Sequence, residues 1–469
     1  MQTAKWRKNK ILPTIGISTL GCPKNLVDTE NIAGILHGAG YPITADHSKA
    51  DISLVNTCTF IEESTNESQE ILTELSKQEQ KLIITGCMAQ RFKGDLFNKF
   101  PNTQAIVGTG NISDILKVIK KVTVNLNNDK SLQIVKVDEI PMAVADSSTP
   151  RLNTQIGPSA YLKIAEGCAH RCAFCIIPYL RGNTRSRTIE DIVTEAKRLV
   201  KSGVKEIVLV SQDSTAYGTD IYKRRALADL LREVADKSNA TWVRLMYAYP
   251  GETDEEILDV IAKKTNIVKY IDIPLQHASA RILKSMRRPS AVKDTIKLIR
   301  KKLPNGTIRT TFVVGFPDET KEDFNELYNF IKETRFDRVG VFTYSKEKGT
   351  PAFDFENQVP GEIKQERRDK LMKLQQQISL EKNQSFIGKE MDMLVEYLKY
   401  DVKAIHELPQ RKKHHGTPKR VVGRSFRDAP EIDGQLYIDL KSNDTTPMPG
   451  EFIKVKIVDC DEYDLFCKL

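Results

Sequence analysis

The sequence lacks any long hydrophobic run. Its longest apolar stretches are too short and too interrupted to cross a bilayer, and residues 1–16 carry a basic patch without an apolar core of signal-peptide length. These absences argue against a membrane protein and against a secreted one. We therefore expect a soluble chain with no membrane partner, located in the cytoplasm, where thiols stay reduced.

The sequence also lacks the paired C-x2-C units that are typical of zinc sites. Instead, Cys168, Cys172 and Cys175 form a C-x3-C-x2-C run, and no fourth cysteine lies near enough in sequence to complete a closed site. A structural zinc site needs four ligands, and disulfides suit short secreted chains. Three thiolates in this spacing can bind three corners of a four-iron cluster, which leaves one iron open for chemistry.

A second group of cysteines is scattered along the first part of the chain. Cys22, Cys58 and Cys87 each follow a predicted strand, at residues 14–20, 51–57 and 81–85. Because the carboxyl ends of parallel strands lie side by side, the three thiols are expected to converge on a second metal site with a vacant position. Lone cysteines are also common as small buried apolar residues, which is the alternative for this group. We treat Cys460 and Cys467 as unrelated to either site.

Alternating strand and helix patterns predict an α/β protein. With 40% hydrophobic and 28% charged residues, the composition is that of an ordinary globular chain, and 469 residues suggest about three domains of roughly 150 each. We expect a parallel α/β domain at 12–125, a linker with one edge strand at 126–156, a partial (βα)6 barrel with a connecting helix at 157–385, and a small antiparallel OB-like β-barrel at 386–469. The C-x3-C-x2-C run follows the first barrel strand, where barrels of this kind place their active sites.

The basic residues of the C-terminal part gather in one predicted hairpin. The net charge is +9, and the segment 408–428 includes Arg411, Lys412, Lys413, Lys419 and Arg420. Such a cluster favours contact with RNA or a ribosome. A solvated loop without a partner is equally compatible with the pattern.

The cysteine motifs resemble those of a known enzyme family. EGCAHRCAFCIIP resembles the radical S-adenosylmethionine enzymes, and LGCPKNLVDTE, NTCTF and TGCMAQR resemble their methylthiotransferase branch. The resemblance covers nearly the whole chain. It implies an N-terminal cluster domain, a radical S-adenosylmethionine partial barrel and a C-terminal TRAM barrel.

Within this branch, the chain is more similar to the enzymes that modify an aspartate of ribosomal protein uS12. The tRNA-modifying members carry a GCQMN-like start and a GQNVNSY-like segment, whereas this chain has GCPKN at 21–25 and SQDSTAY at 211–217. The resemblance therefore favours the protein substrate, as free uS12 or in the small ribosomal subunit. Two alternatives stay open: 2-methylthiolation of a modified tRNA adenosine, and a non-catalytic iron–sulfur module that binds RNA.

The resemblance also implies roles for the two cysteine groups. The barrel cysteines would hold a 4Fe-4S cluster whose open iron binds S-adenosylmethionine and cleaves it to a radical that removes hydrogen from the aspartate β-carbon. The N-terminal cysteines would hold a second 4Fe-4S cluster that carries the sulfur. An electron donor such as flavodoxin or ferredoxin is implied, and the TRAM domain is expected to contact rRNA.

Further candidates for cofactor binding lie near predicted strand ends. The resemblance assigns the amino end of S-adenosylmethionine to Gln212 and Asp213 and its adenine to Gly315, Phe316 and Pro317. Arg244, Gln276 and His277 are expected to face the same cavity, although His277 could instead be a structural histidine.

Overall fold

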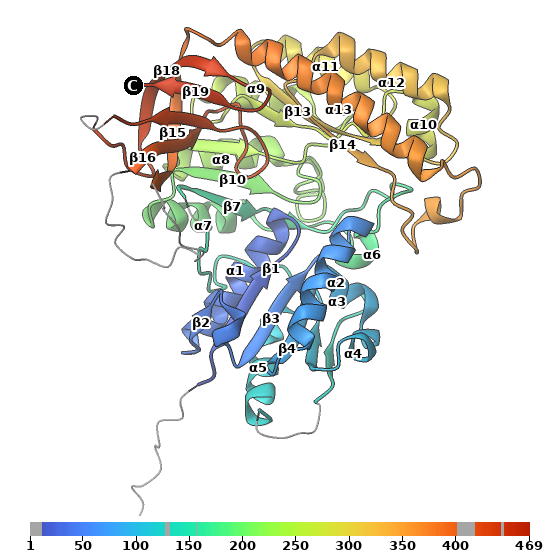
Figure 1. Cartoon of the computed structure of the whole chain (residues 1–469), viewed down its shortest axis with the longest axis vertical. Helices are drawn as coiled ribbons and strands as arrows, with labels where there is room; N and C mark the ends of the chain where they lie inside the picture. The colour runs from blue at the N-terminus through green and yellow to red at the C-terminus, as the bar shows by residue number, and fades with distance from the viewer. Residues whose placement is uncertain (1–11, 127–131, 156, 401–417, 442–444) are drawn as a thin grey trace, which may run out of the picture.

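The structure is a computed structural model that describes residues 12–126, 132–155, 157–400, 418–441 and 445–469. Figure 1 shows an N-terminal α/β layer in blue below a central layer of strands and helices in green to orange, with a small red barrel at one side. In the described ranges, no helix combines the length and the apolar character needed to cross a membrane.

The N-terminal part is one parallel sheet with strand order β2-β1-β3-β4-β5-β6. Its strands are β1 (Ile15–Thr19), β2 (Ile43–Thr44), β3 (Ile52–Thr57), β4 (Lys81–Gly86), β5 (Thr103–Val107) and β6 (Ile134–Lys136). The central strand β3 is buried along its whole length, because helices cover both faces of the sheet. This arrangement confirms the predicted parallel α/β fold of this part.

The two faces of this sheet carry separate hydrophobic cores. α1 (Pro23–Gly38) and α5 (Ile115–Val124) pack on one face, and α2 (Glu62–Ser76), α3 (Cys87–Phe92) and α4 (Asp95–Lys99) pack on the other. Leu54 and Ile83 point to the first core, whereas Val55 and Ile84 point to the second. The alternation of side chains along a strand explains this division.

The central part contains six parallel strands in the order β7-β10-β11-β12-β13-β14. They are β7 (Ser159–Lys163), β10 (Glu206–Val210), β11 (Trp242–Leu245), β12 (Tyr270–Asp272), β13 (Thr307–Val314) and β14 (Arg338–Thr343). A bridge between Val243 and Ile267 connects the two halves of the sheet. Among the described residues, no ladder joins β14 back to β7, so the barrel is open, as predicted.

Amphipathic helices cover the outside of this open barrel. They are α7 (Ile189–Lys201), α8 (Leu227–Lys237), α9 (Glu255–Lys263), α10 (Ala280–Ser285), α11 (Val292–Lys302) and α12 (Lys321–Thr334). Thr188 caps the amino end of α7, because its side chain accepts a hydrogen bond from Asp191 N–H. Asp254 caps α9 in the same way. Their apolar faces form one continuous core with the strands.

The long helix α13 (Gly361–Gln384) leads to a closed C-terminal barrel with strand order β15-β16-β17-β19-β18. Its strands are β15 (Glu390–Tyr400), β16 (Pro418–Arg424), β17 (Leu436–Asp439), β18 (Phe452–Cys460) and β19 (Leu465–Lys468). All of its strand pairs are antiparallel except β17 with β19. Full closure leaves this small sheet without an exposed edge.

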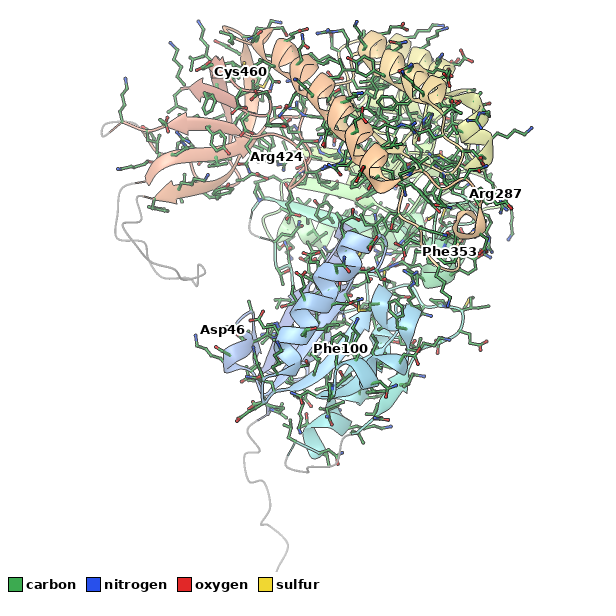
Figure 2. The ribbon with its side chains drawn as sticks, turned by 45° about the vertical axis from the view of Figure 1, so that its right-hand side comes forward. Asp46, Phe100, Arg287, Phe353, Arg424 and Cys460 are labelled. Carbon is green, nitrogen blue, oxygen red and sulfur yellow. The ribbon has the colours of Figure 1, made fainter. Side chains whose placement is uncertain are left out.

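The C-terminal barrel docks on the amino ends of the central strands. Arg424 donates to Ser159 Oγ and Glu206 Oε2, and Figure 2 shows Arg424 at this junction. Tyr161 donates to the backbone oxygen of Pro430, and Tyr270 donates to Asp433. The carboxyl ends of the same strands are therefore left to face the N-terminal part.

Candidate metal centres

The three N-terminal cysteines lie at the carboxyl ends of three adjacent strands. Cys22 follows β1, Cys58 directly follows β3, and Cys87 directly follows β4. The ladders pair Thr19 with Asn56 and Thr57 with Gly86, so the three strand ends are in register. The sheet therefore brings together cysteines that are far apart in the sequence, at the edge where parallel sheets bind ligands.

Two glycines make this convergence possible. Gly21 and Gly86 precede Cys22 and Cys87, with φ of +89° and +90°. A Cβ on Gly21 would lie 2.6 Å from Cys58 Cβ, and one on Gly86 would lie 2.6 Å from a backbone oxygen of Thr57. Both the positive φ and the close approach require glycine.

The charge environment differs among these three thiols. Burial disfavours the thiolate of Cys22, but the cations of Lys24 and Arg181, together with backbone N–H groups of Asn25 and Lys24, outweigh burial and hold its pKa below the ordinary value. Burial raises the pKa of the Cys58 thiol, and it raises the pKa of the Cys87 thiol to about 12 even though Arg181 acts in the opposite direction. Cys22 is thus the thiol of this group that the protein prepares best for ligation.

The cysteines of the C-x3-C-x2-C run lie in the loop after β7 and the short β8 (Ala165–Glu166). The backbone holds this loop, because Cys168 N–H donates to Gly182 O and Cys175 N–H donates to Cys172 O. Burial raises the pKa of the Cys168 thiol to about 12, with Asp213 adding to the effect. Arg288 Nη1 lies 3.9 Å from Cys172 Sγ and supplies a nearby positive charge.

The donor atoms suit iron–sulfur clusters better than single ions. Among the described residues, only His170, Asp213 and Glu252 bring three potential ligand atoms within 4.8 Å of one another. A tetrahedral zinc ion with Zn–S bonds of about 2.3 Å would hold its sulfurs about 3.8 Å apart. Neither cysteine group brings its three sulfurs within 4.8 Å of one another in the described residues. A four-iron cluster is larger and is held by thiolates alone.

The two cysteine groups face each other across the domain boundary. Cys87 packs against Ile176 and Leu180. Ile176 directly follows the C-x3-C-x2-C run, and Leu180 belongs to the next helix, α6 (Ile177–Arg181). Arg181 ends α6 and lies near Cys87 and Cys22, which both raise its own pKa against the effect of burial. One short helix thus connects the two sites.

A buried ionic network stabilises this boundary. Arg181 donates to Asp28 Oδ2 at 3.0 Å, to Glu166 Oε1 at 2.9 Å and to Asn25 Oδ1 at 2.5 Å. Lys163 donates to the same two carboxylates, Asp28 and Glu166. All of these residues are at most 5% exposed, and two cations balance two anions. The network fixes α1 relative to the first barrel strand.

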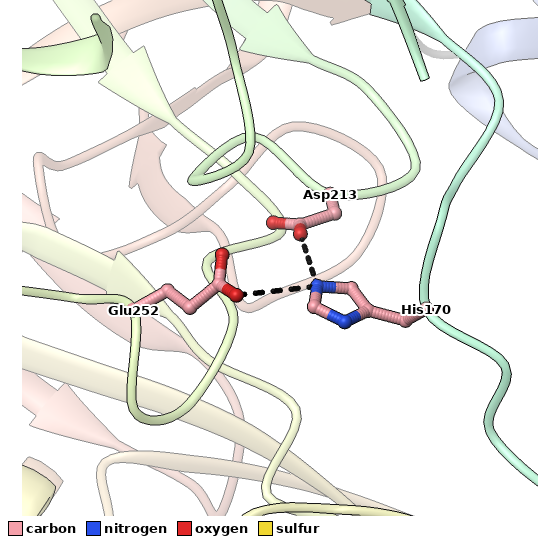
Figure 3. A group of neighbouring side chains, drawn as sticks. All are labelled: His170, Asp213 and Glu252. Atoms are coloured by element: carbon pink, nitrogen blue, oxygen red, sulfur yellow. Dashed lines mark hydrogen bonds and ion pairs between the residues drawn. The ribbon is translucent and has the colours of Figure 1, made fainter. Parts of the chain in front are cut away.

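A polar group lies beside the barrel cysteines. His170 Nε2 is 2.7 Å from Asp213 Oδ2 and 3.8 Å from Glu252 Oε1, as Figure 3 shows. The His170 ring stacks on the Tyr249 ring with 3.7 Å between the centroids. The guanidinium of Arg288 also lies over the Tyr249 ring, 4.2 Å from its centroid. Asp213 Oδ1 also accepts from Thr215 N–H. The carboxylate of Asp213 is thus fixed by its neighbours.

The remaining predicted cofactor residues lie at the same edge of the barrel. Gln212 Nε2 donates to Glu166 Oε1, while its own buried Oε1 has no partner among the described residues. Gly315 has φ of +72°, and its N–H donates to Glu319 Oε2. Phe316 precedes Pro317 in the sequence. The Phe316 ring is fully buried in a cluster that includes Ala173 of the cysteine loop. This ring supports that loop, so contact with a cofactor there would come from the backbone.

Gln276 and His277, which were expected to face the cofactor cavity, follow β12 and are held by hydrogen bonds with neighbouring backbone groups. Gln276 adopts φ of +73° and pairs by its backbone with Thr311 and Val313. His277 is fully buried, and its Nδ1 accepts from Ser279 N–H at 3.0 Å. Its Nε2 has no hydrogen-bond partner among the described residues and lies 3.7 Å from Glu319 Oε2, so only one ring nitrogen of His277 is hydrogen-bonded there.

Arg244 requires a correction. It was expected to face the cofactor cavity, but its guanidinium is fully buried, donates to Glu206 Oε1 at 2.7 Å and donates to Phe426 O at 3.0 Å. Glu206 begins β10, at the amino end of the barrel, and Phe426 belongs to the docked C-terminal part. Arg244 thus stabilises domain docking at the end opposite the cysteines.

The basic C-terminal hairpin is described only in part. Arg411, Lys412 and Lys413 lie outside the described residues, whereas Lys419 and Arg420 belong to β16. Arg420 forms a surface ion pair with Asp439 of β17 at 2.5 Å.

Several residues of the site had not been selected from the sequence. They are Lys24, Asn25, Asp28, Lys163, Glu166, His170, Arg181, Tyr249 and Arg288. Isolated charged residues carry no periodic signal, and only folding brings them to one boundary. A usable hint was the proximity of Lys24, His170 and Arg181 to the cysteines.

Family models match all three parts of the chain. The model of the radical SAM superfamily matches residues 162–331, that of the uncharacterized protein family UPF0004 matches residues 14–108, and that of the TRAM domain matches residues 387–469. The structure is similar to that of the radical S-adenosylmethionine methyltransferase TsrM from Kitasatospora setae, solved with cobalamin and a 4Fe-4S cluster. The TM-score is 0.53 at 16% identity, over 73% of this chain and 77% of that one. This likeness supports the fold alone.

Curated relatives match nearly the full length. The proteins from Trichormus variabilis and Crocosphaera subtropica, both named ribosomal protein uS12 methylthiotransferase RimO, are 45% and 44% identical over 97% of this chain and cover 98% and 99% of their own lengths. Identity at this level over all three parts shows common descent of the whole architecture. The chain therefore belongs to the family of ribosomal protein uS12 methylthiotransferases named RimO.

Proposed function

We propose that this chain adds a methylthio group to the β-carbon of an aspartate in ribosomal protein uS12. The observation that carries the proposal is the pair of cysteine-only sites, one on each side of a domain boundary and connected through Arg181. Full-length relatives at 44–45% identity support the choice of uS12 over tRNA as the substrate.

In this proposal, Cys168, Cys172 and Cys175 hold a 4Fe-4S cluster that binds S-adenosylmethionine. Together these groups supply the radical chemistry that removes hydrogen from an unactivated carbon, which no side chain can do by acid–base means. Of these cysteines Cys172 is buried while Cys168 and Cys175 are partly exposed, and Arg288 offsets the negative charge of the thiolates. The Oε1 of Gln212, which has no partner in the described part of the chain, is available to accept a hydrogen bond from the cofactor.

The second centre holds the sulfur-carrying cluster in this proposal. Cys22, Cys58 and Cys87 provide its three ligands, and the strand register keeps their positions fixed. Lys24 and Arg181 favour the thiolate form of Cys22. Because both centres lie along one boundary, a substrate placed between them could reach both.

The partners follow from the same function. Radical chemistry on S-adenosylmethionine needs an electron, so we include a donor such as flavodoxin or ferredoxin. The TRAM domain, at the far end of the barrel from the cysteines, is the part that we expect to contact rRNA. A ribosomal substrate and reduced thiols both support a cytoplasmic location as part of this proposal.

A deletion strain tests the substrate directly. Mass spectrometry of uS12 from the strain should show loss of the methylthio mass increment on one aspartate, restored by the wild-type chain. As the control, 2-methylthioadenosine in tRNA should be unchanged. Loss of the tRNA modification with intact uS12 would instead identify a tRNA methylthiotransferase, and loss of neither would favour the non-catalytic module.

A further inference from the structure

Arg288 brings a positive charge to the C-x3-C-x2-C loop from the other half of the open barrel. Its Nη1 lies 3.9 Å from Cys172 Sγ, although the two residues are 116 positions apart in the sequence. Its Nη2 donates to Pro274 O, and its Nε is buried without a hydrogen-bond partner among the described residues. The guanidinium is therefore held between the backbone after β12 and a cysteine of the loop.

The backbone fixes the position of Arg288 relative to this loop. After α10, Arg287 takes a left-handed φ of +57°, and Arg288 N–H donates to Leu283 O at 2.8 Å, which is the hydrogen bond of a Schellman helix end. Met286 O at the same helix end accepts from Ala173 N–H of the cysteine loop at 3.0 Å. The segment that carries the guanidinium is thus hydrogen-bonded to the loop that carries the thiols.

The ring of Tyr249 supports the guanidinium. The Cζ of Arg288 lies 4.2 Å from the ring centroid, and the same ring stacks on His170, which Asp213 holds at 2.7 Å. A planar guanidinium stacked on an aromatic face is preorganised, so it loses less conformational entropy for each contact than the ammonium of a lysine. The chain's own residues therefore keep the charge beside the sulfur.

The charge of Arg288 acts on the three cysteines of the loop. Among the described residues, no carboxylate forms an ion pair with this guanidinium. Burial raises the pKa of the Cys168 and Cys175 thiols, and Arg288 opposes this rise at both, in addition to its contact with Cys172. All three ligands of the candidate centre thus experience the same cation.

We propose that Arg288 is a positioning residue that raises the reduction potential of the four-iron cluster held by Cys168, Cys172 and Cys175. This inference rests on the proposed function, which includes a cluster on these cysteines. Reduction transfers one electron from the donor to the cluster and moves no proton, so the cluster becomes more negative by one charge. A nearby cation and an N–H group directed at a ligand sulfur both stabilise the more negative form. The donor then reduces a larger fraction of the cluster.

A redox titration of the chain with both clusters reconstituted tests this inference. The reduced clusters are followed by electron paramagnetic resonance, and the signal that disappears when Cys168, Cys172 and Cys175 are all changed to Ala belongs to the barrel cluster. The variants are Arg288→Gln, which removes the charge and keeps a polar side chain, and Arg288→Lys, which keeps the charge. Arg287→Gln is the matched control, because Arg287 is the exposed neighbour in the sequence.

We expect the equilibrium constant for one-electron reduction of the barrel cluster to fall at least tenfold in Arg288→Gln, which lowers the midpoint potential by about 59 mV. Arg288→Lys should stay within about threefold of the wild type, because the charge persists although the planar fork is lost. Arg287→Gln should stay within about twofold, since water and salt screen an exposed charge. Every variant should keep about eight irons, and the potential of the second cluster should not move.

An unchanged midpoint potential in Arg288→Gln would overturn the inference. An equal fall in Arg287→Gln would overturn it as well, because the effect would then not depend on the contact with Cys172. Loss of about four irons from Arg288→Gln would show that Arg288 is needed to bind the cluster, which contradicts a role in setting its potential. In all three cases the proposed function stands if the wild type still adds the methylthio group to uS12. A wild type that lacks the signal of the barrel cluster would instead contradict the proposed function itself.

Discussion

Arg181 Nη2 donates a hydrogen bond of 2.5 Å to Asn25 Oδ1, across the boundary between the two cysteine groups. Arg181 lies six residues after Cys175, and Asn25 lies three residues after Cys22. The contact therefore sets the position of one site relative to the other. Asp28 and Glu166 bind the same guanidinium and keep it in place.

Removal of this guanidinium should destabilise the boundary. In Arg181→Met, the carboxylates of Asp28 and Glu166 keep only Lys163 as a cation, and breaking a buried pair costs about 3–5 kcal/mol. We expect a lower thermal midpoint and loss of methylthiolation even when iron is bound. Arg338→Met is the matched control, because it breaks the buried pair with Asp428 far from the cysteines. An equal loss of modification in both variants would show that general instability, and not the boundary, is the cause.

Iron and sulfide analysis tests the number of clusters. Two four-iron clusters require about eight irons per chain, and replacement of Cys168, Cys172 and Cys175 together by Ala should leave about four. Replacement of Cys460 and Cys467 should change nothing, because neither belongs to the two groups. A wild-type content of about four irons would show that the N-terminal thiols hold no cluster.

The docking of the C-terminal barrel should depend on pH through Glu206. Burial raises the pKa of this carboxyl, but Arg244 and Arg424 outweigh burial and hold it at about 2, below its ordinary value of 4.5. Because the folded-state pKa is depressed, the stabilisation is fully present above about pH 4.5 and is lost as the pH falls toward 2. Thermal midpoints measured between pH 7 and 3 should fall less steeply for Glu206→Gln than for the wild type.

The same variant should already be less stable at pH 7, because it leaves the buried guanidinium of Arg244 without its carboxylate and leaves Arg424 with Glu396 alone. Glu233→Gln removes a carboxylate from an exposed pair on α8 and serves as the control. If both variants follow the wild-type pH profile, Glu206 does not hold the barrel in place.

The basic hairpin should contribute through charge alone. Since Arg420 already pairs with Asp439, the cations to neutralise are Arg411, Lys412 and Lys413. The triple variant should raise KM for ribosomal substrate and reduce the slope of log affinity against log salt by about 2–3, with uncoupled cleavage of S-adenosylmethionine unchanged. An unchanged salt slope would identify the segment as a solvated loop.

The sequence was sufficient to predict the architecture because its periodic patterns are local. Short apolar runs located β3 and β4, and the helical pattern at Ile189–Lys201 located α7. The convergence of Cys22, Cys58 and Cys87 was predictable because strand ends in a parallel sheet share one edge.

The ionic contacts across boundaries could not be predicted in the same way. Arg244 lies on a barrel strand, yet its side chain reaches Glu206 and the backbone of Phe426, which depends on how the C-terminal barrel docks. Arg181 and Lys24 have partners more than a hundred residues away in sequence. Such pairings depend on tertiary packing, which leaves no short-range pattern.

The central claim is that the two cysteine groups along one boundary have separate roles, one in cleavage of S-adenosylmethionine and the other in sulfur transfer. The most direct test is the variant with Cys22, Cys58 and Cys87 all changed to Ala, incubated anaerobically with reductant, S-adenosylmethionine and uS12. Both 5′-deoxyadenosine and the mass of uS12 would be measured. We predict that cleavage of S-adenosylmethionine continues while the methylthio group no longer appears. Loss of cleavage in a folded variant that keeps about four irons would contradict the claim.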